Sequence, residues 1–301
     1  CMTEISAADT ILSRQLKLIV ASGITEVVMT TGYFDKILMD YCESLNLPLH
    51  IDFVNNPKYS ETNYIYSIYC ARELLDDDIL LMHGDLVFDF EVLLGVLRTE
   101  QSCMKVSSTE PLPDKDFKAV VKNGRVEKVG IEFFESAMEA QALYKLNKDD
   151  WNVWLKEIVE FCESGNVKVY AENAFNRVSD ECGIYAFDAK GKLCAEIDTP
   201  EDLEIVKAKL KKVENRTVYM CFSTDMLHSG HIAIIKKAEK LGKLVVGILS
   251  DEAVASFKRF PLIPYEDRKT LFENIWGVSR VIKQETLSYR DVLNELKPDI
   301  V

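Results

Sequence analysis

The chain has 301 residues, of which 48% are apolar and 28% charged, and its 49 acidic and 36 basic side chains give a net charge of −13. This composition excludes a disordered or fibrous protein, and the acidic balance disfavours a nucleic-acid-binding protein, which must neutralise phosphates. No apolar run approaches the roughly 20 residues of a transmembrane helix, so we predict no membrane partner. The eight cysteines are dispersed without a Cys-x-x-Cys pair, which is typical of a cytoplasmic protein.

Helix-like and strand-like segments alternate along the first 100 residues. Apolar residues recur at helical spacing from Ile11 to Val20, between the capping residues Thr10 and Gly23. The remaining segments follow the same rhythm: we expect strands at 27–31, 49–54 and 79–83, and helices at 64–75 and 90–97. This alternation predicts an α/β architecture with a mostly parallel sheet.

The later segments are shorter, and the pattern restarts after residue 214. We expect strands at 103–108, 117–122 and 125–131, a helix at 151–162, a hairpin of 167–170 with 182–187, and a helix at 201–212. A new strand at 218–222, a helix at 230–241 and a strand at 244–249 follow. Residues 215–301 carry 13 basic and 11 acidic side chains, whereas residues 1–214 carry 23 and 38. We therefore predict two domains, 1–214 and 215–301.

The motif His228-Ser229-Gly230-His231 follows a predicted strand and begins a predicted helix. Backbone N–H groups and the dipole at a helix N-terminus bind anions, and Gly230 allows a phosphate to approach the backbone. Two imidazoles there can donate hydrogen bonds to nucleotide phosphates. The spacing also arises by chance, so a structural role of the histidines is the alternative.

Residues 218–301 resemble the H-x-G-H nucleotidyltransferases of the glycerol-3-phosphate cytidylyltransferase group, in particular the domain found ahead of phosphoenolpyruvate mutase in phosphonate biosynthesis. The resemblance rests on the histidine motif, on Asp225 ahead of it, and on the basic residues after the next strand. It implies catalytic roles for His228 and His231. It implies nucleotide binding by Asp225, Gly230, Lys258 and Arg268. Phe222 and Thr224 depart from the family pattern, and two later family motifs would lie beyond Val301, so we expect this domain to be incomplete.

Two carboxylate segments in the first domain are candidates for a metal site. His83-Gly84-Asp85 follows a buried strand, at the strand end where open α/β sheets bind ligands, and a carboxylate there can hold Mg²⁺. Asp198 belongs to the acidic segment 196–203. A turn at Gly84-Asp85 and a helix cap ahead of Pro200 are the alternatives.

Residues 1–214 resemble the sugar-nucleotidyltransferase superfamily, and most closely its phosphocholine and 2-aminoethylphosphonate cytidylyltransferases. The resemblance is carried by Asn56-Pro57-Lys58-Tyr59, Thr62-Asn63, Ser67-Ile68-Tyr69, Gly84-Asp85, Tyr144-Lys145-Leu146 and 196–203. It implies that Asp85 and Asp198 are catalytic and hold Mg²⁺, and that Asn63 and Gly84 lie near the nucleotide. The family's glycine-rich phosphate loop would lie ahead of Cys1, so we expect a fragment that transfers CMP poorly.

The resemblances together predict two Rossmann-like α/β/α nucleotidyltransferase domains with mostly parallel sheets, the first of which transfers CMP from CTP to a small acceptor. Tyr170 and Glu172 are candidate acceptor ligands, because an ammonium group binds carboxylates and aromatic faces. Trp151 and Trp154 have the same chemistry, but their helical spacing favours core packing. We expect 2-aminoethylphosphonate as the acceptor. Phosphocholine, or an H-x-G-H domain that only docks a fused or partner mutase, is the alternative; a homo-oligomer is compatible with all three.

Overall fold

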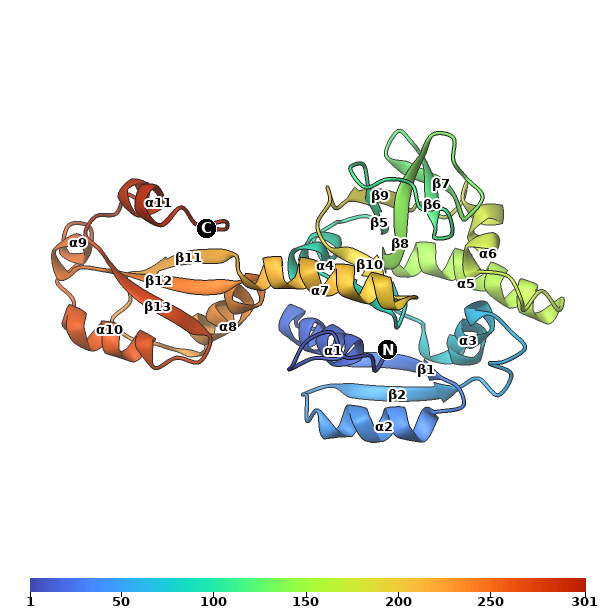
Figure 1. Cartoon of the computed structure of the whole chain (residues 1–301), viewed down its shortest axis with the longest axis horizontal. Coiled ribbons are helices and arrows are strands. Elements are labelled where there is room, and N and C mark those ends of the chain that lie inside the picture. Colours follow the sequence, from blue (N-terminus) through green and yellow to red (C-terminus); the bar gives the residue numbers. More distant parts are fainter. The chain divides into compact units, whose positions relative to one another are not determined.

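The computed structural model describes all 301 residues and divides into two compact units, Cys1–Val206 (unit 1) and Lys207–Val301 (unit 2). The division falls within helix α7, Pro200–Glu214, which contributes residues to both units (Figure 1). The boundary predicted at residue 214 is the last residue of this helix. No helix is both long and apolar enough to span a bilayer.

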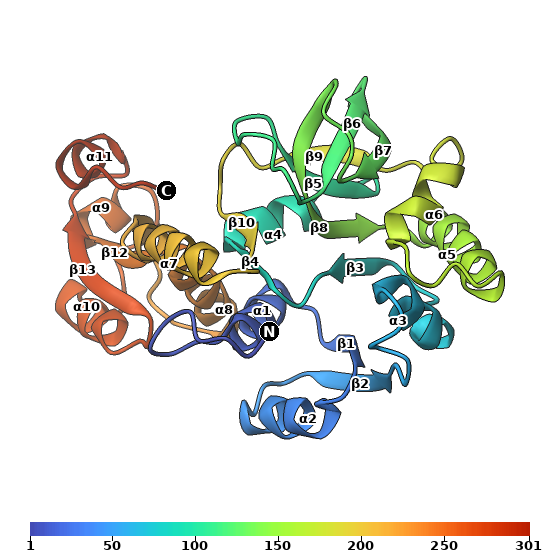
Figure 2. The same ribbon diagram turned by 45° about the vertical axis from the view of Figure 1, so that its right-hand side comes forward.

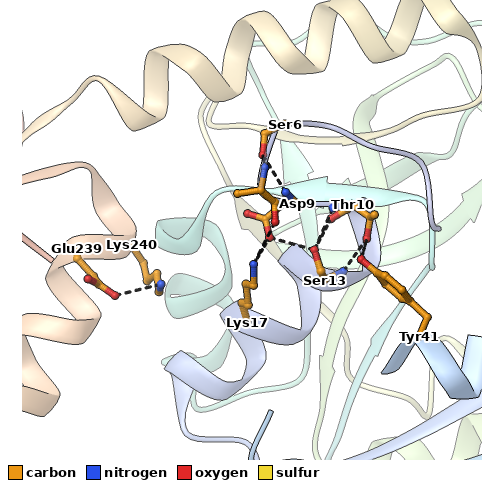
Figure 3. Close-up of polar contacts among 9 residues, drawn as sticks. Ser6, Asp9, Thr10, Ser13, Lys17, Tyr41, Glu239 and Lys240 are labelled. Carbon is orange, nitrogen blue, oxygen red and sulfur yellow. Dashed lines mark hydrogen bonds and ion pairs between the residues drawn. The ribbon is translucent and has the colours of Figure 1, made fainter. Parts of the chain in front are cut away.

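Helix α1, Ile11–Ser22, begins and ends where the sequence predicts. The Ser13 amide donates to Thr10 Oγ1 at 3.1 Å and the Thr10 amide donates to Ser13 Oγ at 2.9 Å, which satisfies two backbone donors at the helix start. The Thr10 hydroxyl also bonds the Tyr41 hydroxyl at 2.9 Å, which ties α1 to the next helix (Figure 3). Gly23, with φ of 100°, ends α1 in the left-handed conformation that glycine adopts readily.

Strands β1, Glu26–Thr31, and β2, His50–Asn55, form a two-stranded parallel sheet. Helix α2, Asp35–Ser44, connects them and runs alongside β2 in both views (Figures 1 and 2). Leu16 and Ile19 of α1 and Cys42 of α2 share one apolar cluster with side chains of both strands. The two helices therefore pack against the apolar side chains of this sheet, which are partly buried.

The largest sheet of unit 1 is mostly antiparallel, so the prediction of a mostly parallel sheet is wrong here. Its strand order is β3-β8-β5-β9-β7-β6. The strands are β3 Ile79–Met82, β5 Cys103–Ser107, β6 Lys118–Lys122, β7 Arg125–Gly130, β8 Ala137–Leu146 and β9 Tyr185–Asp188. Only β5 and β9 pair in parallel. A two-residue turn, Asn123-Gly124 with φ of 52° and 80°, joins β6 to β7, and so short a loop connects only antiparallel strands.

The hairpin predicted from residues 167–170 and 182–187 does not form. Helix α6, Ala171–Val178, follows residue 170 and packs beside helix α5, Lys148–Glu163. Trp154 on α5 is fully buried and its indole N–H donates to the Ala171 carbonyl at 2.9 Å. The segment therefore closes the core as a helix, because the apolar face of α6 finds its partner on α5.

The remaining elements of unit 1 bring distant segments together. They are helix α3 Tyr64–Ala71, the 3-10 turn η1 Arg72–Leu74, strand β4 Leu86–Phe88, helix α4 Phe90–Leu97 and strand β10 Cys194–Glu196. Strands β4 and β10 pair antiparallel, with Glu196 opposite Leu86. The Ile197 amide also donates to the Asp85 carbonyl at 3.2 Å. This pairing places the two predicted carboxylate segments side by side.

Unit 2 is a three-stranded parallel sheet with helices on both faces. Its strands are β11 Thr217–Phe222, β12 Lys243–Leu249 and β13 Val278–Gln284, and its helices are α8 Ser229–Ala238, α9 Asp251–Ala255, α10 Tyr265–Glu273 and α11 Arg290–Leu296, with the 3-10 turn η2 Glu239–Leu241 after α8. Leu244 packs in a cluster with Ile235 and Phe272. Its neighbour Val245 packs with Val292 in a second cluster. Successive residues of the strand thus pack on opposite faces of the sheet, as in a parallel sheet that is buried on both faces.

Candidate active site

Carboxylates from separate segments of unit 1 meet at the end of β3. The ligand atoms of His83, Asp85 and Glu196 lie within 4.8 Å of one another. Those of Asp116, Glu196 and Asp198 also lie within 4.8 Å of one another. Glu196 belongs to both groups and so links Asp85 to Asp198, the two residues predicted as metal ligands. Sequence reasoning did not select His83, Asp116 or Glu196, although His83 and Glu196 lie in the segments that it singled out.

The cluster carries more negative than positive charge. His83 Nδ1 lies 3.0 Å from Glu196 Oε1. Burial lowers the pKa of His83, but the hydrogen bond with Glu196 and the charges of the nearby carboxylates together raise it by more. The net shift of this pKa is upward. Burial and the charge of Glu196 raise the pKa of Asp85, and burial and the charges of Glu196 and Asp198 raise the pKa of Asp116. A bound cation would relieve this repulsion.

The donor set of the cluster fits Mg²⁺. Asp85 Oδ1 and His83 Nε2 are buried and have no hydrogen-bond partner. Such atoms are rare in folded proteins and call for a water molecule or an ion. Mg²⁺ takes carboxylate oxygens and completes its shell with water and phosphate, so Asp85, Glu196 and Asp198 are suitable ligands. Mg²⁺ bound there would offset the charge of nucleotide phosphates.

A cavity of about 840 Å³ adjoins the carboxylates. Ligand pockets of roughly 300–1,000 Å³ are typical of enzymes. Apolar residues of α1, β1 and β3 line this cavity together with Asn63, Gly84, Lys115 and the carboxylates. Asn63 also caps α3, because its side-chain oxygen accepts from the Tyr64 amide at 2.7 Å. The structure thus brings the predicted nucleotide residues Asn63 and Gly84 to the same cavity as Asp85.

Five aromatic side chains line the same cavity: Tyr64, His83, Phe117, Trp151 and Tyr170. The ring centroids of Tyr64 and His83 are 4.7 Å apart, those of Phe117 and Tyr170 are 5.1 Å apart, and those of His83 and Phe117 are 6.2 Å apart. Sequence reasoning selected Tyr170 as an acceptor ligand and favoured core packing for Trp151, which is fully buried. The other three rings come from distant parts of the chain. The rings provide faces that attract cations.

Glu172 is buried next to one of these rings, that of Tyr64. It is 1% exposed, and its two carboxylate oxygens accept hydrogen bonds from the Tyr64 hydroxyl and, at 2.8 Å, from the Tyr144 hydroxyl. Burial raises the pKa of Glu172, although His83 and the two tyrosines lower it in part. Glu172 is not among the cavity-lining residues, whereas Tyr64 is. Glu172, which was predicted as an acceptor ligand, therefore does not line the cavity itself; it contacts the lining residue Tyr64 through a hydrogen bond.

In unit 2 the two motif histidines form the N-terminus of α8. His228 Nδ1 accepts from the Gly230 amide at 3.1 Å, and His231 Nδ1 accepts from the His228 amide at 3.3 Å. The ring centroids are 3.9 Å apart. Because each Nδ1 is an acceptor, each neutral ring carries its proton on Nε2, which can donate to a ligand. Burial and the neighbouring His228 lower the pKa of His231, which favours its neutral form.

Gly230 lies directly against the His228 ring. A Cβ atom at this position would lie 2.9 Å from His228 Cε1 and 3.0 Å from His228 Nδ1. A larger residue would therefore displace the His228 ring from the amide that it accepts.

The predicted nucleotide residues of unit 2 fall into two groups. Lys258 Nζ donates to Ser223 Oγ at 3.1 Å, and Arg259 lies 3.7 Å from Asp225, so the basic segment meets the loop that precedes the histidines. Asp225 Oδ1 is buried without a partner. Arg268 is instead 1% exposed and donates to Asp251 at 2.6 Å. The structure thus places Arg268 in an internal ion pair.

The last part of the chain is similar to proteins of known families. Residues 221–301 match the model of the cytidylyltransferase-like family. The chain is 36% identical over 81 residues to FAD synthase of Methanopyrus kandleri, a match that covers 26% of this chain and 54% of that protein. It is 31% identical over 106 residues to CMP-5'-(3-aminopropyl)phosphonate synthase of Streptomyces rubellomurinus, covering 35% and 17%. It is 38% identical over 74 residues to ethanolamine-phosphate cytidylyltransferase of Arabidopsis thaliana, covering 24% and 18%. The chain spans about half of the first relative and under a fifth of the other two.

Solved structures share the fold over a larger part of the chain. The inositol-1-phosphate CTP transferase from T. maritima has a TM-score of 0.57 and 18% identity, covering 70% of this chain and 87% of that one. CTP:phosphocholine cytidylyltransferase from Streptococcus pneumoniae has a TM-score of 0.50 and 16% identity, covering 68% and 87%. These shares exceed the length of unit 2, so the likeness extends over unit 1. The chain therefore has a mixed α/β fold like that of these two transferases, together with a segment that matches the cytidylyltransferase-like family model.

Proposed function

We propose that unit 1 transfers CMP from CTP to a phosphonate or phosphate oxygen of a small amino-bearing acceptor and releases pyrophosphate. The carboxylate cluster of Asp85, Glu196 and Asp198 beside an open cavity is the observation that carries this proposal. The acceptor oxygen is already anionic, so the reaction needs alignment and charge neutralisation more than a strong base. In this reaction the cluster residues hold Mg²⁺, and Asn63 and Gly84 lie beside the nucleotide.

The acceptor that we favour is 2-aminoethylphosphonate, which places the reaction in phosphonate biosynthesis. Support comes from two relatives whose names specify CMP transfer to an aminopropylphosphonate and cytidylyl transfer to ethanolamine phosphate, both of which carry a primary amine. Phosphocholine is the second candidate. It is favoured by the aromatic rings that line the cavity, since a trimethylammonium group has no donors and binds aromatic faces.

For unit 2 we propose nucleotide binding at the helix start formed by His228 and His231, with Asp225, Gly230 and Lys258 beside them. The proposal is supported by the two Nε2 donors, the N-terminus of α8 and the match of residues 221–301 to cytidylyltransferase-like domains. A non-catalytic domain that docks a phosphoenolpyruvate mutase is the alternative. The two differ in whether this unit binds CTP.

The test is ³¹P NMR of CTP, Mg²⁺ and each acceptor incubated with the protein expressed from its natural reading frame. The expected products are pyrophosphate and a CMP-linked phosphonate from 2-aminoethylphosphonate, with slower conversion of phosphocholine. The Asp85→Asn variant should abolish this product, whereas His228→Asn should leave it. Loss of the product in His228→Asn with retention in Asp85→Asn would assign the reaction to unit 2 and refute the proposal for unit 1.

A further inference from the structure

Lys118, the first residue of β6, is fully buried, yet its ammonium group binds backbone oxygens. Its Nζ donates to the Pro113 carbonyl at 2.5 Å and to the Asp116 carbonyl at 3.0 Å. It also lies 4.4 Å from the ring centroid of Phe134. Burial of an ammonium is unfavourable unless its donors are satisfied, so these contacts determine where the side chain lies. The charge of Lys118 is thereby used to hold the segment that precedes it.

That segment forms part of the candidate active site. Residues 108–117 contain neither helix nor strand; at their end the Phe117 carbonyl accepts from the Ala140 amide of β8 at 3.1 Å. Lys115, Asp116 and Phe117 nevertheless line the cavity. The carboxylate of Asp116 lies within 4.8 Å of the ligand oxygens of Glu196 and Asp198.

We infer that Lys118 is a positioning residue that holds the carboxylate of Asp116 beside Glu196 and Asp198. It binds two carbonyls on either side of the turn at 113–116, and one of these carbonyls belongs to Asp116 itself. Glu196 and Asp198 repel the carboxylate of Asp116 because all three carry negative charge. Residues 108–117 form a loop, so without the Lys118 bonds this repulsion would move the Asp116 carboxylate towards solvent. The inference rests on the proposed function in one respect, namely that the carboxylate cluster binds a divalent cation.

The first measurement is Mn²⁺ affinity without nucleotide, by electron paramagnetic resonance on the 301-residue chain. Lys118→Met keeps the length of the side chain and removes its donors. We expect it to weaken Mn²⁺ binding about tenfold, as removal of an outer partner of a metal ligand usually does. Asp116→Asn should weaken binding to a similar extent, and the double variant should be no weaker than either alone, because both act through one carboxylate. Lys122→Met is the matched control, because this residue lies on the same strand but is exposed.

The second measurement is amide hydrogen exchange over residues 110–117, which separates positioning from direct binding. Exchange should become faster in Lys118→Met and stay unchanged in Asp116→Asn and Lys122→Met. If Lys118→Met does not fold cooperatively, Lys118→Arg replaces it. The guanidinium group of arginine meets the two carbonyls in a different geometry, so amide exchange of residues 110–117 and Mn²⁺ affinity should both change in this variant.

A folded Lys118→Met chain with parental Mn²⁺ affinity would overturn the inference, as would weaker binding without faster loop exchange. Absence of Mn²⁺ binding by the parental chain would overturn it as well. If Mn²⁺ binds and depends on Lys118 but no CMP transfer is found, the proposed function fails and the positioning role stands.

Discussion

Glu196 shows how one side chain joins two ligand groups. Its carboxylate lies within 4.8 Å of the ligand atoms of His83 and Asp85, and also within 4.8 Å of those of Asp116 and Asp198. Its Oε1 is also 3.0 Å from His83 Nδ1, so the imidazole orients one of its oxygens. At the residue scale, the chemistry of the site therefore depends on Glu196 as much as on the two aspartates that the motifs indicated.

Replacement of the cluster carboxylates should remove CMP transfer without unfolding the protein. We expect Asp85→Ala, Asp198→Ala and Glu196→Gln each to lower kcat at least about 100-fold, since loss of a metal ligand removes several kcal/mol of transition-state stabilisation. Steady-state rates over a Mg²⁺ titration are the measurement. Glu201→Gln, an exposed acid in the same segment outside both ligand groups, is the control. Near-parental turnover in Asp85→Ala or Asp198→Ala would reduce that residue to a turn or a cap.

Stability should depend on pH through Asp85 with a defined sign. Burial and the charge of Glu196 raise the pKa of Asp85 in the folded protein, so the folded state binds this proton more tightly than the unfolded state does. The resulting stabilisation is present at low pH and is lost as the pH rises through the raised pKa. Without divalent cations, Asp85→Asn should therefore melt higher than the parent at pH 7, and the difference should shrink towards about pH 4, near the unfolded pKa. A lower Tm of the variant at pH 7 would contradict this expectation; Mg²⁺ should raise the Tm of the parent only.

The two acceptor candidates can be separated at Glu172 and Tyr170. Glu172→Gln removes a negative charge behind Tyr64, so we expect it to lower kcat/KM for 2-aminoethylphosphonate more than for phosphocholine. Tyr170→Leu removes an aromatic face and should lower kcat/KM for phosphocholine more than for 2-aminoethylphosphonate. Tyr170→Phe, which keeps the ring, is the control. Side-by-side kinetics with both acceptors give the answer. A higher parental kcat/KM for phosphocholine, or equal effects of Glu172→Gln on both, would favour the phosphocholine alternative.

At the scale of elements, the start of α8 is both a helix cap and a ligand-binding end. His228 accepts from the Gly230 amide, and the open Nε2 atoms of both rings remain for a ligand. Gly230→Ala would place Cβ 2.9 Å from the His228 ring, so the ring must move. We expect CTP affinity of unit 2 to fall about tenfold, or about 1.4 kcal/mol, by calorimetry in an Asp85→Asn background. Ser229→Ala, next to it on the same helix, should bind CTP as before; equal binding by Gly230→Ala would mean that the cap geometry does not serve the ligand.

Many helices and strands were predictable from local signals. Thr10 and Gly23 mark the ends of α1, and the apolar runs at 218–222 and 244–249 are β11 and β12. The pairing of strands in unit 1 was predicted wrongly, although Asn123-Gly124 between two apolar runs is a strong hairpin signal. Residues 171–178 were missed as a helix although Ala171, Ala174, Phe175 and Val178 recur at the helical spacing i, i+3, i+4 and i+7.

At the scale of the whole molecule, each unit has its own core and its own candidate ligands. All residues of the carboxylate cluster belong to unit 1, and both motif histidines belong to unit 2. Mg²⁺ alone should therefore slow amide exchange near residues 83–86 and 194–198 and leave residues 217–250 unchanged. Exchange measured by mass spectrometry with and without Mg²⁺ tests this, with Asp85→Asn as the control that should lose the effect. Protection centred on His228 and His231 would instead place the cation site in unit 2.

The sequence by itself determined the α/β class, the ends of several helices and the two motifs that point to nucleotide chemistry, because these depend on residues close together in the chain. Only the tertiary structure decided the composition of the site. The pairing of β4 with β10 brings Glu196 to Asp85, and the Lys118 contacts bring Asp116 to the same place. Such contacts join segments that are distant in sequence, and their closure depends on the packing of the whole unit, which no local pattern of residues encodes.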